Sequence, residues 1–143
     1  MSLEGHYDPD NIFAKILRGE IPCAKVYEDE HVLSFMDAFP QTRGHCLVIP
    51  KAASRNLLDA SGKTLGRMIG RTQTIARAVQ TALEPDGIIM TQFNGAPAGQ
   101  TVFHLHFHII PRYTGGDMNA HAAGTMADMD TLNDLAAQIS GAL

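Results

Sequence analysis

The sequence predicts a single α+β domain built on an antiparallel sheet, with one long helix and a C-terminal helix. Short apolar stretches with strand character follow one another over brief turns. Apolar residues also recur at helical spacing over residues 60–83, and a second helical pattern closes the chain. Because 143 residues suit one core better than two, we assign 1–143 to one domain, with 1–10 as a flexible N-terminus.

A short helix and three strands are expected in the first half of the chain. Asp10 or Asn11 can cap a helix over Phe13–Leu17, and Gly19 can end it. The last two strands are separated by a turn or loop over residues 38–44. The three predicted strands are Ala24–Tyr27, His31–Met36 and His45–Ile49.

The second half holds the long helix, two strands and a last helix. Its predicted elements are a helix over 60–83, a strand over Ile88–Phe93, a loop over 94–99, a strand over Phe103–Ile110 ended by Pro111, a mobile segment over Thr114–Gly124 and a helix over about Thr131–Leu143. The long helix carries an apolar stripe, which fits burial within one subunit and pairing of two subunits equally well. This stripe consists of Leu65, Met68, Ile69, Thr72, Ile75, Ala76, Val79 and Leu83.

Three of the seven histidines alternate in the stretch HLHFHII, at His104, His106 and His108. Successive side chains of a strand point to opposite faces, so these three are expected to share one face. The residues predicted to face a core on the other side are Phe103, Leu105, Phe107 and Ile109. A metal site, a site for phosphoryl chemistry and an ordinary polar strand face all fit this pattern.

A metal site on this strand needs ligands from elsewhere in the chain. Neighbouring histidines on one face lie roughly 7 Å apart, and the outer pair roughly 13 Å. A tetrahedral zinc holds each imidazole nitrogen at about 2.1 Å, so two neighbours can reach one ion and three only with distortion. No cluster of Cys, Asp or Glu at ligand spacing lies close by in the sequence.

Phosphoryl chemistry needs a nucleophile and anion-binding donors, and the sequence places both together. Imidazole is nucleophilic near neutral pH, and a second imidazole can orient it or donate to an anionic oxygen. The loop Asn94–Thr101 leads into the histidine strand, and its glycines, Gly95 and Gly99, allow backbone N–H groups to approach a phosphate. We therefore favour phosphoryl chemistry.

Composition narrows the classes of partner. The net charge of −4 argues against a nucleic-acid partner, which needs a basic surface, but it is compatible with a local pocket for a small anion. No apolar run is long enough to span a bilayer, so no membrane partner is expected. Cys23 and Cys46 form neither a C-x-x-C pair nor a disulfide framework, which favours reduced thiols in a cytoplasmic protein.

The stretch GQTVFHLHFHIIPR, from Gly99 to Arg112, resembles the signature of the histidine triad (HIT) superfamily of nucleotide hydrolases and transferases. The similarity extends over most of the chain. The opening helix and next strands of that family are similar to Ile12–Leu17, Gly19–Pro22, Val32–Asp37 and Gly44–Lys51.

The resemblance implies a reaction at the α-phosphate of nucleoside phosphoramidates or nucleotidyl-acyl compounds. His106 is then the nucleophile, which forms a nucleotidyl-histidine that water hydrolyses. His108 is implied to contact the phosphate, while His104 and His45 hold the tautomer and orientation of the nucleophile. This chemistry needs no cofactor.

The resemblance also implies a site for purine nucleotides. Asp37 matches the carboxylate that accepts from the ribose hydroxyls, and Gln100 and Thr101 match contacts to the phosphate or leaving group. Four apolar residues match the walls around the base, although plain core packing explains Phe35 equally well. The implied nucleotide-binding residues are Asp37, Asn94, Gly99, Gln100, Thr101, Ile12, Phe13, Ile16 and Phe35.

The chain departs from the family pattern at a zinc site found in many bacterial relatives. That site uses two cysteines, a histidine and the first triad histidine, and the matching positions here are Asn11, Ala14, Ala53 and His104. A single remaining ligand cannot hold a structural zinc, so we predict no metal.

Two further departures lie near the expected pocket. A polar residue of the family is replaced by Phe93, which leaves open whether Asn94 makes the corresponding contact. Phe39 and Arg43 lie in the loop 38–44, where they are expected at the pocket rim.

Two alternatives to the leading function stay open. One is a dinucleoside polyphosphate hydrolase of the same superfamily, and the other is a regulatory nucleotide-binding protein with little turnover. Resemblance to the small nucleotide-binding branch also implies a homodimer, in which the long helix and the strand before the loop pair two subunits.

Overall fold

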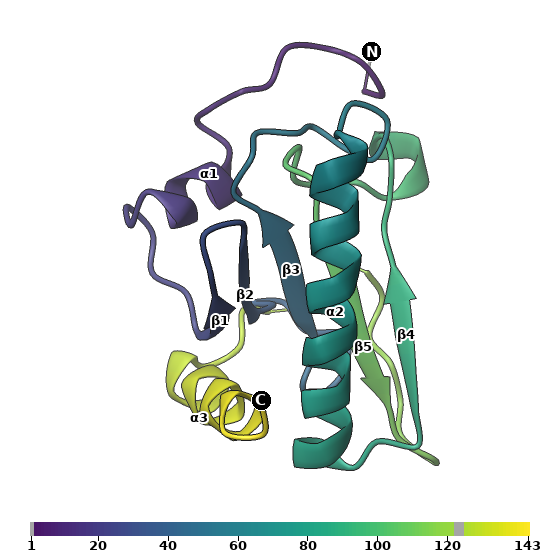
Figure 1. The fold of residues 1–143 in the computed structure, drawn as a ribbon. Helices are drawn as coiled ribbons and strands as arrows, with labels where there is room; N and C mark the ends of the chain where they lie inside the picture. The colour runs from purple at the N-terminus through teal and green to yellow at the C-terminus, as the bar shows by residue number, and fades with distance from the viewer. Residues whose placement is uncertain (1, 122–124) are drawn as a thin grey trace.

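The computed structural model describes residues 2–121 and 125–143, which form a five-stranded antiparallel sheet of order β1-β2-β3-β5-β4 with three α-helices (Figure 1). The strands are β1 (Lys25–Glu28), β2 (Val32–Met36), β3 (Cys46–Pro50), β4 (Gly87–Thr91) and β5 (Phe107–Arg112). The helices are α1 (Ile12–Leu17), α2 (Gly62–Leu83) and α3 (Met129–Ser140), with a short 3₁₀ helix η1 (Ala96–Ala98). The α+β class predicted from the sequence is confirmed.

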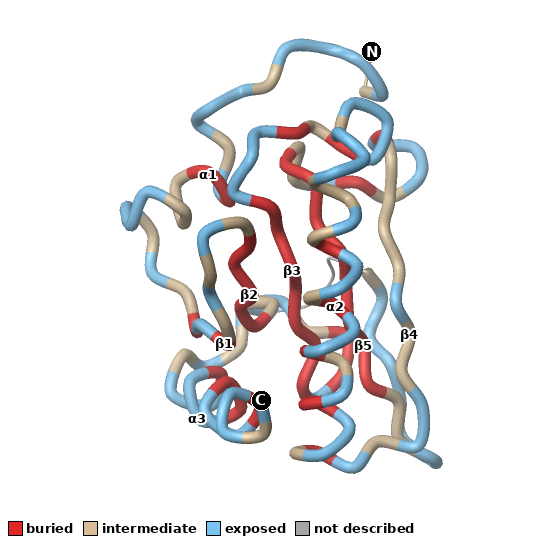
Figure 2. The backbone as a smooth tube through the Cα atoms, viewed as in Figure 1, coloured by how far each residue is buried: buried red, intermediate tan, exposed pale blue. Residues whose placement is uncertain are grey.

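The two faces of the sheet carry different layers. The helices α2 and α3 cover one face and bury the larger core, to which Val32, Met36 and Val48 belong. The short helix α1 covers part of the other face, where Phe13 packs in a smaller cluster with Leu33, Phe35, Leu47 and Ile49. Burial is concentrated in the central strands β2, β3 and β5, whereas the edge strand β4 is partly exposed (Figure 2).

Local capping accounts for the start and end of α1. Of the two predicted caps, Asn11 is the one used, because its Oδ1 accepts a hydrogen bond from the Ala14 N–H at 2.9 Å. After the helix, Gly19 has a φ of 77°, a left-handed conformation that costs glycine little. One face of the helix is apolar, since Phe13 is buried and Ile16 and Leu17 pack against its cluster.

The apolar stripe of α2 is used mainly within this chain. Met68, Ile75 and Val79 are completely buried in the larger core. Ile69 is the exception, because 51% of its surface is exposed. The stripe therefore contributes to the fold of one subunit, and Ile69 lies on the outward side of the helix.

The histidine strand begins later than predicted, because β5 starts at Phe107 and not at Phe103. β3 pairs with β5 no further than Val48 with Phe107. Continued pairing would bring Pro50 opposite Leu105, and proline has no N–H to donate. The Leu105 N–H instead donates to the Ser54 carbonyl at 2.8 Å. His104 and His106 therefore precede the strand, and only His108 lies within it.

Two further expectations about this strand are corrected. Leu105, Phe107 and Ile109 do lie in the larger core, but Phe103 does not, and its ring instead contacts the Arg55 guanidinium at 4.3 Å. The strand also continues through Pro111 to Arg112. The last residue of β5 paired with β3 is Ile109, so beyond it only β4 pairs with β5 and the missing N–H of Pro111 is tolerated.

Segments predicted to be flexible or mobile make specific contacts. Ser2 and Leu3, in the N-terminal stretch, offer their carbonyl oxygens to the side chains of Arg55 and Asn56. The predicted mobile segment Thr114–Gly124 includes residues 122–124, which lie outside the described residues. These contacts do not measure motion, so both expectations stay predictions.

Candidate functional site

Three neighbouring strands bring Asp37, His45 and His108 together on the face of the sheet that carries α1. Leu47 pairs with His108 across β3 and β5, and Phe35 pairs with Leu47 across β2 and β3. Side chains two positions apart share a face, so Asp37 lies beside Phe35 and His45 beside Leu47. The Asp37 N–H donates to the His45 carbonyl at 3.0 Å, which continues the pairing past the ends of the strands.

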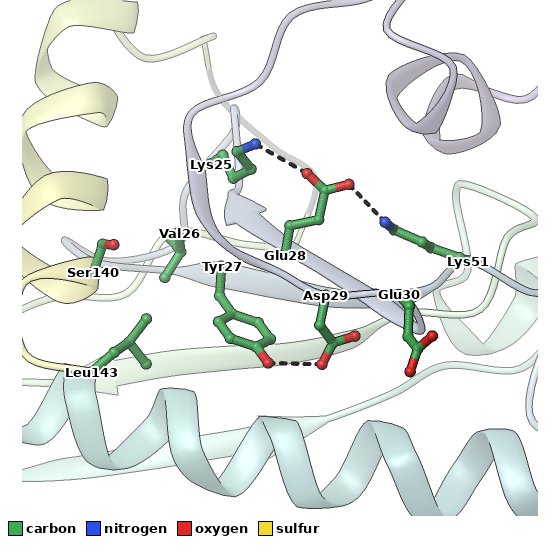
Figure 3. Close-up of a pocket in the computed structure, with 9 residues that line it drawn as sticks. All are labelled: Lys25, Val26, Tyr27, Glu28, Asp29, Glu30, Lys51, Ser140 and Leu143. Carbon is green, nitrogen blue, oxygen red and sulfur yellow. Dashed lines mark hydrogen bonds and ion pairs between the residues drawn. The ribbon is translucent and has the colours of Figure 1, made fainter.

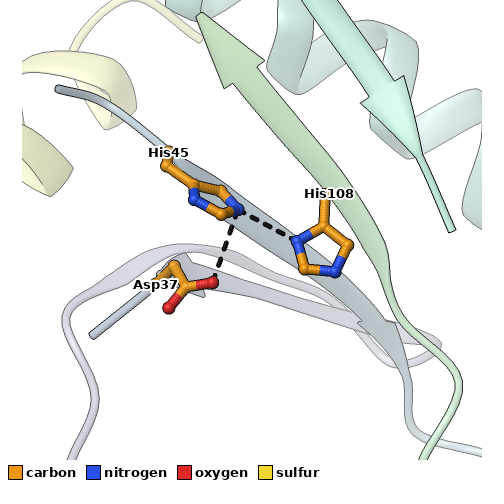
Figure 4. Close-up of side chains that lie close together, drawn as sticks. All are labelled: Asp37, His45 and His108. Atoms are coloured by element: carbon orange, nitrogen blue, oxygen red, sulfur yellow. Dashed lines mark hydrogen bonds and ion pairs between the residues drawn. The ribbon is translucent and has the colours of Figure 1, made fainter. Parts of the chain in front are cut away.

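A single backbone N–H sets the tautomers of two of these histidines. Gln41 donates its N–H to His45 Nδ1 at 3.0 Å, so the hydrogen of the neutral His45 ring is on Nε2. That hydrogen is donated to His108 Nδ1 at 2.9 Å (Figure 4). His108 consequently carries its hydrogen on Nε2, a buried atom with no hydrogen-bond partner among the described residues. The unused donor of His108 is available to a ligand.

His106 is held with the opposite tautomer. Its Nδ1 lies 2.7 Å from the His104 carbonyl oxygen, which can only accept, so Nδ1 carries the hydrogen. Nε2 therefore has a free lone pair. The ring is packed edge to face against Phe13 at 4.9 Å and against His108 at 5.0 Å between centroids. This packing fixes the direction of the lone pair.

His104 is buried and both of its nitrogens are engaged. Nε2 donates to the Pro50 carbonyl at 2.8 Å, and Nδ1 accepts from the Tyr7 hydroxyl at 2.5 Å. His104 therefore supports the site through its backbone oxygen, which orients His106, and its ring has no nitrogen free for a ligand.

Burial keeps the histidines neutral near pH 7. It lowers the pKa of His106 and the pKa of His45 to about 4, and it lowers the pKa of His108 still further. Burial also raises the pKa of Asp37 to about 6. Asp37 Oδ2 lies 3.4 Å from His45 Nε2, but His45 is neutral and its Nε2–H is donated to His108, so this contact is not an ion pair.

A cavity of about 300 Å³ opens on this face, next to His106 and His108. Its lining is mostly apolar, as is typical of a small-molecule site with a few placed polar groups. The predicted residues that line it are Ile12, Phe13, Ile16, Phe35, Asp37, Thr101, His106 and His108. Phe39 of the loop 38–44 lines it as well.

The other predicted residues of the 94–101 loop hold the loop together. The Gln100 amide accepts from the Gly95 N–H at 2.9 Å and donates to the Arg55 and Val102 carbonyls. Asn94 exchanges hydrogen bonds with Gln92 and accepts from the Leu57 N–H. Both amides are therefore occupied within the protein, and their predicted contacts with a nucleotide stay predictions.

Among the described residues, Asp37, His45 and His108 offer potential ligand atoms within 4.8 Å of one another. A metal would need the lone pair of His45 Nε2, yet the Gln41 N–H forces the hydrogen of the neutral ring onto that atom. The three residues are thus arranged for hydrogen bonding and not for a metal. At the positions of the relatives' zinc site, Asn11 caps α1 and His104 has no free nitrogen.

A larger hollow of about 610 Å³ lies at β1 beside the end of α3 (Figure 3), and no histidine lines it. Several of its polar side chains are paired with one another. Lys25 and Lys51 donate to Glu28 at 3.0 and 2.8 Å, and Tyr27 donates to Asp29 at 2.7 Å. Because these groups satisfy each other and none of the predicted site residues lines the hollow, we place the functional site in the smaller cavity.

The sequence does not predict several contributors to the site. Tyr7 bonds His104, the Gln41 N–H orients His45, and His121 lines the cavity, with its ring 4.5 Å from that of Phe93. His121 lies in a segment without periodicity, and Gln41 acts through its backbone. No local sequence pattern could have identified His121 or Gln41.

Comparison with solved structures supports the same fold. A HIT-like protein from Bartonella henselae, described as involved in cell-cycle regulation and solved with an unknown ligand, has a TM-score of 0.89 at 50% identity, covering 96% of this chain and 100% of that one. A zinc-bound histidine triad family protein from Mycobacterium smegmatis has a TM-score of 0.79 at 34% identity, covering 93% and 92%.

Sequence relatives agree with the structural ones. The protein named "hit" of Bacillus subtilis is 47% identical over 112 residues, which cover 78% of this chain and 77% of that protein. An adenylylsulfatase of Arabidopsis thaliana is 41% identical over 103 residues, 72% of this chain but 52% of the plant protein. Residues 18–115 match the HIT domain. From this match, and from the relatives that share it over most of their length, it follows that the chain belongs to the HIT domain family.

Proposed function

We propose that this protein hydrolyses nucleotidyl compounds at the α-phosphate through a covalent nucleotidyl-His106. The observation that carries this proposal is the free lone pair of His106 Nε2 beside the unused Nε2–H of His108, at a cavity of about 300 Å³. A neutral nucleophile next to a hydrogen-bond donor is the pair that attack on a phosphate ester requires. The name adenylylsulfatase of the plant relative supports adenylyl compounds as the substrate class.

In the first step, Nε2 of His106 forms a bond to the α-phosphorus. The bond from phosphorus to the leaving group breaks, and the leaving group keeps the electron pair. Nδ1 of His106 retains its hydrogen, and the His104 carbonyl oxygen offsets the positive charge that develops on the ring. His108 donates a hydrogen bond from Nε2 to a phosphate oxygen, and a departing amine takes its proton from solvent.

In the second step, a water oxygen bonds to the same phosphorus. The bond between phosphorus and Nε2 breaks, and the electron pair returns to the His106 ring. The water releases a proton to solvent, and the nucleoside monophosphate leaves.

The remaining contacts of the nucleotide follow from the cavity lining. Ile12, Phe13, Ile16 and Phe35 would surround the base. Asp37 offers Oδ2 to the ribose hydroxyls, because its Oδ1 already accepts from the Phe39 N–H at 2.8 Å. Thr101 would contact the phosphate from the loop.

The test is to mix the protein with adenosine 5′-phosphoramidate, quench it within one turnover and locate any adenylyl adduct by mass spectrometry. We expect the adduct on His106 and AMP as the product. His106→Ala should lose turnover by at least about 10³-fold, since a nucleophile is removed, while its affinity for AMP changes little. Near-full hydrolysis by His106→Ala would refute the assignment.

The same assay separates the two alternative functions. A dinucleoside polyphosphate hydrolase would cleave diadenosine polyphosphates faster than the phosphoramidate. A regulatory nucleotide-binding protein would bind AMP tightly and release no product.

We also propose that the protein forms a homodimer. We further propose that it works in a reducing compartment such as the cytoplasm. Ile69 on α2 and Met90 on the edge strand β4 are 51% and 43% exposed, and these are the two elements expected to pair subunits. Both cysteines are free thiols, and among the described residues no helix has the length and apolarity to cross a bilayer. Light scattering should give a molar mass twice that of the monomer, and the molar mass of Ile69→Glu should be lower.

A further inference from the structure

Four aromatic rings form a continuous row along the cavity. Phe13 contacts His106 at 4.9 Å, His106 contacts His108 at 5.0 Å, and His108 contacts His121 at 5.3 Å between centroids. All four residues line the cavity. Phe13 and His121 therefore lie at opposite ends of the row, with the two reactive histidines between them.

The order of the rings gives the direction of a bound substrate. The apolar wall around Phe13 suits the base, and the α-phosphorus must lie at His106 and His108. A leaving group departs from phosphorus on the side away from the attacking nitrogen. It therefore extends past His108, toward His121.

Contacts on both sides of His121 hold its ring at this end of the cavity. Asn119 donates its N–H to the Gln41 carbonyl at 2.8 Å and accepts from the Gln41 side chain at 2.9 Å. Ala127 donates its N–H to the Ala38 carbonyl at 2.8 Å. His121 Nε2 donates to the Gly99 carbonyl at 2.7 Å, which leaves Nδ1 as the nitrogen available to a ligand.

We propose that His121 contacts the leaving group and makes the enzyme selective for leaving groups that depart as oxyanions, such as a carboxylate or a sulfate. This inference rests on the proposed function. When the phosphorus–oxygen bond breaks, its electron pair stays on the departing oxygen. The imidazolium form of His121, with Nε2–H on Gly99, carries a second N–H on Nδ1 that can donate to that oxygen.

A leaving amine gains less from the same group. It departs neutral after taking a proton from solvent. A second N–H on His121 then has no developing anion to stabilise. Loss of His121 should therefore slow hydrolysis of substrates with an oxyanion leaving group more than hydrolysis of those with an amine leaving group. His106 is needed for both.

The experiment compares adenylyl sulfate, which releases sulfate, with adenosine 5′-phosphoramidate, which releases ammonia. His121→Phe keeps a ring against Phe93 but removes the donor, and His121→Gln retains a neutral donor. His31→Gln is the matched control, because His31 lies in the β1–β2 connection and does not line this cavity. Thermal unfolding of each variant checks that it is folded.

For His121→Phe we expect kcat/KM for adenylyl sulfate to fall about 10- to 100-fold, and kcat/KM for the phosphoramidate to fall less than about threefold. His121→Gln should lie between the wild type and His121→Phe. Inhibition by AMP, which has no leaving group, should change less than about threefold in each variant. His31→Gln should match the wild type on both substrates.

The outcomes that overturn the inference are distinct from those that overturn the proposed function. If the wild type hydrolyses neither substrate, the proposed function fails and the inference fails with it. If the wild type is active but His121→Phe lowers kcat/KM equally for both substrates, or for neither, only the inference fails.

Discussion

Tyr7 donates its phenolic hydrogen to Nδ1 of His104 across 2.5 Å, although 97 positions separate the two residues. The backbone oxygen of the same His104 accepts from Nδ1 of His106 at 2.7 Å. The N-terminal segment therefore supports the residue whose carbonyl sets the tautomer of the proposed nucleophile.

Tyr7→Phe should weaken both the fold and the catalytic step. The substitution leaves the buried Nδ1 of His104 without a donor, which should lower the free energy of unfolding by about 1–2 kcal/mol. Looser placement of the His104 carbonyl should lower kcat about three- to tenfold with little change in KM. Urea denaturation and steady-state kinetics measure the two effects. Tyr113→Phe is the control, because Tyr113 donates to the Arg43 carbonyl outside the cavity; equal kinetic losses in both variants would contradict a positioning role.

His45→Ala should allow His108 to adopt both neutral tautomers. His45 Nε2–H donates to His108 Nδ1 at 2.9 Å, and the Gln41 N–H holds His45 in that state. Without His45, the hydrogen of His108 can move to Nδ1, which removes the donor proposed to face the substrate. Nitrogen-15 NMR should show a single Nε2–H tautomer of His108 in the wild type and a mixture in the variant. We expect kcat to fall about 10- to 100-fold; an unchanged tautomer would rule out this relay.

Sequence patterns predict the fold more completely than the site. Alternation and helical spacing are local, so they place each strand and helix with small errors at the ends. The largest error, at the start of β5, arose because Pro50 on another strand stops the pairing there. The family resemblance also identifies the triad histidines, His45 and part of the cavity lining. Tyr7 and His121 are not identified in this way, because each reaches the site through contacts distant in sequence that leave no periodic pattern.

Zinc removal should leave the protein folded. Asn11 Oδ1 caps α1, and both nitrogens of His104 are engaged, so the residues at the relatives' zinc positions are committed to other bonds. Incubation with EDTA should not change the melting temperature, and elemental analysis of the purified protein should find far less than one zinc per chain. Stoichiometric zinc that EDTA removes with loss of stability would show this prediction to be wrong.

Stability should fall as the pH drops from about 7 to 4.5, because the buried histidines resist protonation. Burial lowers the pKa of His45 and of His106 to about 4 from 6.5, so the stability they contribute is present above pH 6.5 and is lost as the pH falls through the folded pKa. The pKa of His108 is lowered in the same direction. Burial raises the pKa of Asp37 to about 6 from 3.8, so Asp37 contributes stability below pH 3.8 that is lost as the pH rises through 6. Asp37 therefore partly offsets the loss from the histidines.

Asp37→Asn should steepen this acid destabilisation, because it removes a group that opposes it. Each proton of difference between the folded and unfolded states changes stability by about 1.4 kcal/mol per pH unit, so the variant's slope should be steeper by about that amount between pH 4.5 and 6. Urea denaturation at half-unit pH intervals measures both slopes. Asp86→Asn is the matched control: the Thr114 N–H lowers the pKa of Asp86, so that carboxyl titrates below this window. The stability of Asp37→Asn and of the control could both change with pH at the same slope as the wild type. In that case Asp37 is not protonated in the folded protein in this range, and its partial desolvation beside His45 is too weak to alter its charge.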